Sequence, residues 1–110
     1  MQSSQLLKGT FYTMILKVLS ESERMYGYEI AQKVKSLSGD EIIVNEGSLY
    51  PILHKMEEEG MVVAERIDIG NRTRRYYTLT DSGTAKVPVK LEEFEQFVEV
   101  VRRVLYPTVS

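Results

Sequence analysis

Apolar residues recur at helical spacing in several stretches of the chain. Residues 3–19 carry apolar side chains at steps of four, three, one and three, which place them on one face of a helix. Residues 26–37 repeat this pattern until a Ser-Gly-Asp sequence interrupts it. The β-branched segment 42–44 that follows is either a short strand or an extended crossing towards the next helix.

The next amphipathic stretch predicts a third helix with two unlike faces. Its apolar positions step by three, one and three, and Gly60 stands where a helix favours a left-handed C-terminal residue. Pro51 has no amide hydrogen and is expected in the first turn, so the helix should begin near Gly47 or Ser48, with Ser48 as its N-cap. At roughly 100° per residue, the face opposite the apolar stripe carries Tyr50, Pro51, His54, Lys55 and Glu58.

A β-hairpin and a last helix complete the predicted elements. The strands are Val62–Ile69 and Thr73–Leu79, and the Gly-Asn-Arg sequence between them tolerates the positive φ of a hairpin tip. Thr80 is suited to cap the last helix, which Pro88 should either kink or start afresh. The apolar stripe of this helix consists of Leu91, Phe94, Phe97, Val98, Val101, Val104 and Leu105.

The composition describes a folded protein without disulfides. A chain of 110 residues suits one domain with an appended element, and 43% hydrophobic residues are enough for a core. The absence of cysteine excludes disulfides, thiolate metal sites and thiol catalysis. Apolar runs are far shorter than the roughly 20 residues of a membrane span, and the start lacks a signal-peptide pattern. We therefore expect a cytoplasmic protein with no membrane partner.

Few residues suit catalysis or a cofactor. His54 is the only histidine, and one histidine without cysteine makes no tetrahedral zinc site unless carboxylates complete it. The sequence has no glycine-rich phosphate loop and no Ser/His/Asp set that His54 would complete. We expect no metal, no cofactor and no enzymatic activity.

Three short helices followed by a hairpin match the plan of a winged helix-turn-helix. We predict a mainly α fold with a small β-hairpin, divided into a winged-helix DNA-binding domain in residues 1–83 and a C-terminal dimerisation helix in residues 84–110. In this fold the third helix enters a DNA major groove and the hairpin, or wing, touches the backbone beside it. Residues 65–76 have four arginines against two acidic residues, a local charge of +2 in a chain of net charge −2. A solvated basic strand is the alternative interpretation of that charge.

Several segments together resemble the PadR family of bacterial transcriptional regulators. They are LLKGT near the start, YGYEIAQKV, EGSLYPILHKMEEEG and GNRTRRYYTLTDSG, and they span Leu6 to Gly83. The short C-terminal part is similar to the compact branch of the family, which has one dimerising helix. The resemblance implies a homodimeric repressor that binds a palindromic operator, with DNA contacts from the segment around Tyr50 and Pro51 and from the wing.

The order of the elements, the local charge and the resemblance together indicate a candidate surface for duplex DNA. Phosphate contacts are expected from the wing arginines and from the Tyr50 hydroxyl, although Tyr50 also fits an aromatic that simply packs over its neighbours. His54 is suited to a base edge or phosphate, or else is solvent-exposed, and Lys55 is a phosphate contact or an ordinary surface lysine. Three glutamates at 57–59 would repel a DNA backbone, so only the N-terminal half of the helix should enter the groove. The predicted DNA-binding residues are Ser48, Tyr50, Pro51, His54, Lys55, Arg66, Asn71, Arg72, Thr73, Arg74 and Arg75.

The apolar stripe of the last helix is too long for its own small domain to cover entirely. We therefore expect a second copy of the chain to cover the rest, in a homodimer. The predicted dimer interface consists of Leu7, Phe11, Leu91, Phe94, Phe97, Val98, Val101, Val104 and Leu105. Some members of the resembled family respond to phenolic compounds or drugs, so a small-molecule effector at the dimer interface is compatible with this interpretation. The alternative function is a winged-helix protein–protein interaction module, whose binding should depend far less on salt than a phosphate contact does.

Overall fold

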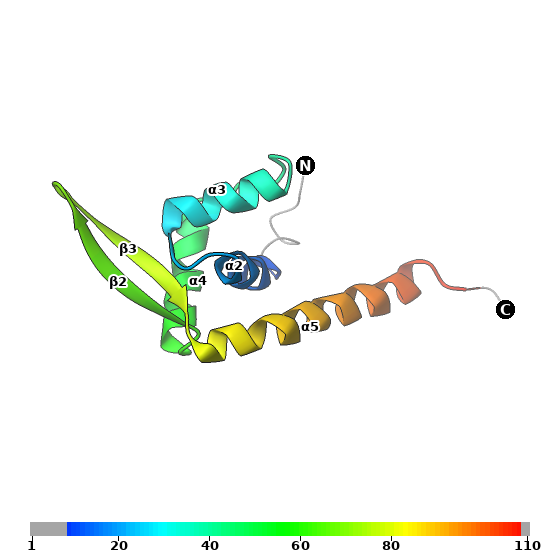
Figure 1. Cartoon of the computed structure of the whole chain (residues 1–110). Coiled ribbons are helices and arrows are strands. Elements are labelled where there is room, and N and C mark those ends of the chain that lie inside the picture. The colour runs from blue at the N-terminus through cyan, green and yellow to red at the C-terminus, as the bar shows by residue number, and fades with distance from the viewer. Residues whose placement is uncertain (1–8, 109–110) are drawn as a thin grey trace.

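The computed structural model describes residues 9–108 and shows a small helical domain with a projecting hairpin and a long last helix (Figure 1). The elements are α2 (Phe11–Ser20), β1 (Met25–Tyr26), α3 (Gly27–Leu37), α4 (Glu46–Glu58), β2 (Val62–Ile69), β3 (Arg72–Leu79) and α5 (Asp81–Leu105). The predicted mainly α fold with a winged helix-turn-helix order is confirmed. Within the described residues no helix is both long and apolar enough to cross a membrane.

The core lies where α2, α3 and α4 meet the base of the hairpin. Ile15 of α2, Ile30 of α3, Leu53 of α4 and Val62 of β2 are each no more than 1% exposed and belong to one cluster. Burying an aliphatic side chain of this size contributes about 1.5 to 3 kcal/mol. The apolar stripe of α4 is thus fixed to the domain, and its opposite face is left to solvent.

The sheet has three antiparallel strands in the order β1-β3-β2. The hairpin pairs Val62 with Leu79 at its base and Ile69 with Arg72 at its tip, so Gly70 and Asn71 form a two-residue turn. Gly70 has a φ of +60°, which a residue without a Cβ adopts most readily. The two-residue β1, which pairs with β3, was not predicted from the sequence.

Helix α5 starts at the base of the wing and extends away from the domain (Figure 1). The Thr80 hydroxyl accepts a hydrogen bond from the Gly83 amide at 3.0 Å, which confirms the predicted cap. Pro88 lies within the helix, so the prediction that the helix starts afresh there is wrong. Pro88 is exposed, and the carbonyl that loses its amide partner can be hydrated on that side.

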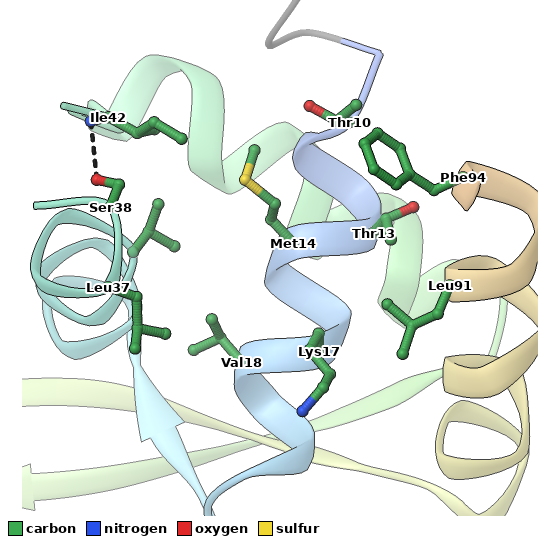
Figure 2. Close-up of a pocket in the computed structure, with 11 residues that line it drawn as sticks. Thr10, Thr13, Met14, Lys17, Val18, Leu37, Ser38, Ile42, Leu91 and Phe94 are labelled. Atoms are coloured by element: carbon green, nitrogen blue, oxygen red, sulfur yellow. Dashed lines mark hydrogen bonds between the residues drawn. The ribbon is translucent and has the colours of Figure 1, made fainter. Parts of the chain in front are cut away.

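The first turns of α5 run beside α2, and a pocket opens between α2, α3 and α5. Figure 2 shows Leu91 and Phe94 of α5 facing Thr13 of α2, whereas Met14 of α2 points to the other side, where Leu37 of α3 lies. The pocket has a volume of about 500 Å³ and an apolar lining. The stripe of α5 therefore begins against its own domain and continues beyond it.

Two predictions about the first helix need correction. The helix was expected over residues 3–19, but Gly9 and Thr10 form a turn and α2 begins at Phe11. Leu7, predicted at the dimer interface, lies outside the described residues. Phe11 is only 8% exposed and belongs to the core, so little of its surface is left for a partner chain.

The start of the third helix also differs from the prediction. Helix α4 begins at Glu46, and its N-cap is Asn45, whose side-chain oxygen accepts a hydrogen bond from the Ser48 amide at 2.9 Å. Ser48 is therefore inside the helix, and Pro51 lies beyond the first turn rather than in it. The segment 42–44 before the cap forms no strand, so the first of the two predicted alternatives is wrong.

Candidate nucleic-acid interface

The outward face of α4 and the wing enclose an open groove. Its volume is about 520 Å³. Its lining residues are Tyr50, His54, Glu57 and Glu58 from α4 and Arg75 and Tyr77 from β3. The groove thus joins the predicted recognition helix to the arginine-rich strand.

Tyr50 is held over the first residue of α3. The side chain is 42% exposed, and its hydroxyl lies 2.6 Å from where a Cβ on Gly27 would stand. Burial raises the pKa of Tyr50 above its usual value of 10.0, and the negative charge of Glu46 and the Tyr77 hydroxyl add to the effect. Tyr50 therefore keeps its proton near neutral pH and presents an O–H donor at the rim of the groove.

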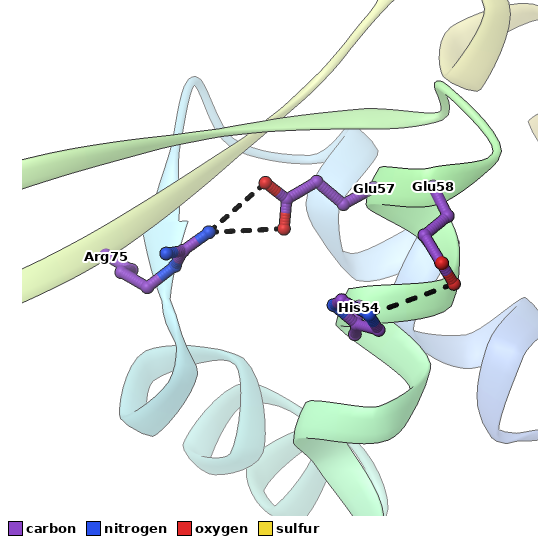
Figure 3. A network of polar contacts seen from close by, with 4 residues as sticks. All are labelled: His54, Glu57, Glu58 and Arg75. Carbon is purple, nitrogen blue, oxygen red and sulfur yellow. Dashed lines mark hydrogen bonds and ion pairs between the residues drawn. The ribbon is translucent and has the colours of Figure 1, made fainter.

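An ion pair crosses the groove, and a contact between His54 and Glu58 lines it (Figure 3). The Arg75 Nη2 atom donates to both carboxylate oxygens of Glu57, at 3.2 and 3.1 Å. His54 Nε2 lies 3.9 Å from Glu58 Oε1, one turn further along the same helix. Glu57 thus holds the guanidinium of Arg75, and Glu58 lies beside the His54 ring.

Lys55 and the two other predicted α4 residues are placed differently. The Lys55 ammonium lies 5.7 Å from the centre of the Tyr12 ring of α2, on a side of α4 that does not line the groove. Pro51 is exposed on the outward face, and Ser48 is half-buried. The structure therefore brings Tyr50 and His54 together with Arg75, but not with Lys55.

Strand alternation divides the wing residues between two faces. Arg66 and Arg75 are Cα partners across the hairpin, so they share the face that contains Tyr77 and the groove. Arg72 and Arg74 lie on the other face, two residues apart. Thr73 donates a hydrogen bond to Asp68 Oδ1 at 3.0 Å, and Asn71 stands at the tip. The four wing arginines, which were predicted as one set, thus lie as two pairs on opposite faces of the hairpin.

Comparison with known proteins identifies the family. Residues 15–88 match the transcriptional regulator PadR-like family. This chain belongs to the PadR-like family. A transcriptional regulator of Mycobacterium tuberculosis is 37% identical over 62 residues, which are 56% of this chain and 55% of that protein. The family predicted from the sequence segments is therefore confirmed.

Solved structures of related regulators agree with the PadR assignment. A transcriptional regulator from Clostridium thermocellum is similar over 98% of this chain and 100% of its own, with a TM-score of 0.84 and 26% identity. Bacillus subtilis PadR in complex with operator DNA is similar over 74% of this chain and 46% of its own, with a TM-score of 0.66 and 28% identity. About three quarters of this chain is thus similar in fold to a PadR protein that was solved with operator DNA.

Sequence reasoning missed the β1 segment of this PadR-like chain. Arg24 precedes β1, and its Nη1 atom pairs with Glu65 Oε1 of β2 at 3.1 Å. Tyr26, the second residue of β1, places its ring 5.3 Å from that of Tyr76 on β3. The alternation of Arg24, Tyr26 and Tyr28 was a weak signal, because a two-residue strand forms only through pairing with β3.

The distal part of α5 is the second candidate surface of this PadR-like protein. Phe97 is 64% exposed, Val104 75% and Leu105 62%. Val98 is also exposed and Val101 is half-buried, while Leu91 and Phe94 line the pocket beside α2. Soluble proteins seldom leave contiguous apolar surface of this kind exposed to water, so it usually marks an interaction site.

Proposed function

We propose that this regulator is a homodimeric repressor that binds a palindromic operator in duplex DNA and acts by occupying its promoter. The observation that carries the proposal is the groove in which the Tyr50 hydroxyl and the Arg75 guanidinium face the same space. Family membership and the operator-bound Bacillus subtilis PadR support a DNA partner. The proposed action is binding rather than catalysis, and we infer a cytoplasmic location because the DNA is there.

The two walls of the groove have different roles in this proposal. The N-terminal half of α4 enters the major groove, where Tyr50 and His54 reach phosphates or base edges. The wing contributes guanidinium groups that bind phosphate oxygens through paired N–H donors and carry little sequence information. Glu57, Glu58 and Glu59 keep the far end of α4 away from the backbone.

The proposed dimer forms through the exposed stripe of α5. Pairing with a second copy removes Phe97, Val104 and Leu105 from water and relates the two α4 helices by a twofold axis. Two recognition helices set about 34 to 36 Å apart would each contact one half of a palindrome. An apolar or aromatic effector is a second candidate ligand, because the pocket between α2, α3 and α5 has an apolar lining that includes Phe94 (Figure 2).

Binding to the DNA upstream of the gene tests the function. The purified protein should shift this fragment in a gel at nanomolar to micromolar concentration, and a shuffled fragment of equal length and composition only at higher concentration. Affinity should fall steeply between two salt concentrations, because neutralised phosphates release counterions. Equal binding to both fragments would contradict operator recognition. No DNA binding, with salt-insensitive capture of a protein partner, would favour the interaction module instead.

A further inference from the structure

The sheet face that points away from the groove carries a stack of two arginines and two tyrosines. We name Arg24, Tyr26, Arg74 and Tyr76 the β1 stack. The Arg74 guanidinium carbon lies 4.2 Å from the centre of the Tyr26 ring, and that of Arg24 lies 4.7 Å from the Tyr76 ring. The two rings meet edge to face at 5.3 Å, and Tyr26 is the Cα partner of Tyr76. Each member therefore contacts at least one other across β1 and β3.

This stack is anchored to the body of the domain. Met25, its neighbour in β1, is buried in the core, and the Tyr26 amide donates to Glu29 Oε1 at 3.1 Å in the first turn of α3. The ion pair of Arg24 with Glu65 extends the anchoring to β2. The base of the wing is thus held on its back face by β1 and on its groove face by Glu57.

Arg74 differs from the other wing arginines in its surroundings. Its side chain is half-buried, whereas Arg66, Arg72 and Arg75 are exposed. A planar guanidinium over an aromatic ring is favourable, and moving it to a phosphate forfeits that contact.

We infer that Arg74 is a positioning residue that holds the wing in its DNA-binding orientation through the Tyr26 ring, rather than a phosphate contact. The inference rests on the proposed DNA-binding function. Three arginines of the hairpin, not four, are then available to phosphate.

Salt-dependent binding to operator DNA distinguishes these two roles. Arg74→Gln should weaken binding about 3- to 10-fold at every salt concentration, as expected for one lost cation–π contact, and leave the salt slope unchanged. Arg75→Gln should instead lower the slope by about 0.9, the value for one phosphate contact. Tyr26→Leu should reproduce the effect of Arg74→Gln, and the double variant should be no weaker than either single one. Tyr26→Phe, which keeps the ring, should bind like wild type.

Amide hydrogen exchange of the free protein gives a readout that needs no DNA. Exchange in β2 and β3 should be faster in Arg74→Gln and Tyr26→Leu than in wild type and Tyr26→Phe. A reduced salt slope for Arg74→Gln with unchanged exchange would overturn the inference and make Arg74 a phosphate contact. Unchanged affinity and exchange in Tyr26→Leu would overturn it too. If wild type does not bind the operator, the proposed function fails, while exchange still decides whether the stack orders the wing.

Discussion

The position of the Tyr50 side chain depends on Gly27, the first residue of another helix. A Cβ at Gly27 would stand 2.6 Å from the Tyr50 hydroxyl oxygen and 3.0 Å from the ring carbon that bears it, both too close for atoms in contact. Neither position suggests the other in the sequence, because they are 23 residues apart and meet only when α3 and α4 pack. A glycine at the start of α3 is thus part of the candidate interface without facing DNA.

Gly27→Ala should therefore displace Tyr50. Overpacking of this kind costs about 1 to 3 kcal/mol if the ring stays, and less if it swings outward. In either case DNA binding should weaken. Chemical unfolding and gel shifts measure the two effects, and Gly9→Ala, which adds a methyl in open space, is the matched control. Unchanged operator affinity in Gly27→Ala would show that the position of Tyr50 does not matter for binding.

Tyr12 is a second tyrosine whose surroundings affect its ionisation. Burial, followed by the hydrogen bond that it donates to Glu59 at 2.5 Å, raises the pKa of Tyr12 well above its usual value of 10.0. The unfolded chain then loses this proton at lower pH than the folded chain. The contribution of Tyr12 to stability is complete below pH 10 and falls as the pH rises towards the folded pKa.

Tyr12→Phe should accordingly make alkaline destabilisation less steep. Urea unfolding between pH 8 and about 11 measures the slope of stability against pH, which should be shallower in the variant than in wild type above pH 10. Tyr106→Phe, at a tyrosine that is 69% exposed, is the control. A slope that Tyr12→Phe leaves unaltered would contradict a raised pKa.

At the scale of elements, the sequence predicted best what hydrophobic periodicity determines. The apolar stripe of α4 was predicted correctly, because burial selects one face of that helix, and the strand Val62–Ile69 was predicted with its correct bounds. The first residues of the helices were harder to predict. Ser48 was favoured as N-cap because Pro51 was expected in the first turn, yet the helix tolerates Pro51 on its exposed face and is capped by Asn45.

Side-chain contacts between residues far apart in the chain could not be predicted from the sequence. The outward position of Tyr50 follows from the rotation of one helix, whereas the contact of Lys55 with the Tyr12 ring needs the packing of α4 against α2. The separation of Arg74 from Arg75 follows from strand alternation, but the partner of each arginine depends on β1 and α4. The sequence is thus enough to select candidate residues, whereas the side chains that each of them contacts depend on how the elements pack.

The affinity for DNA should depend on the charge of Glu57, which pairs with Arg75 and so connects α4 to the wing. Glu57→Gln removes the carboxylate that holds Arg75, so DNA of any sequence should bind more tightly, because Arg75 no longer has to leave Glu57 to reach a phosphate. An ion pair this exposed contributes only about 0.2 to 1 kcal/mol, so stability should change little. Titrations with operator and shuffled fragments measure the effect. Glu95→Gln, which removes the same charge from an exposed position on α5, is the control. Weaker binding by Glu57→Gln would mean that the ion pair presents Arg75 to DNA.

At the scale of the whole molecule, the proposed dimer depends on one helix. Combining Phe97→Glu with Val101→Glu would bury unpaired charges in the α5 interface, at a cost of several kcal/mol. This variant should become monomeric or aggregate by light scattering and lose operator binding. Val89→Glu places the same charge on an exposed position away from the stripe and should remain a dimer. A wild type that is monomeric at micromolar concentration would contradict the proposal.

Because α5 is a single helix from the wing to the stripe, it also fixes a rotational phase between them. One residue inserted between Gln96 and Phe97 would turn the distal stripe by roughly 100° and point it away from a partner. Seven inserted residues would return it to within about 20° of its original direction and lengthen the arm by about 10.5 Å. Such a protein would still pair, but its two recognition helices would match a differently spaced operator.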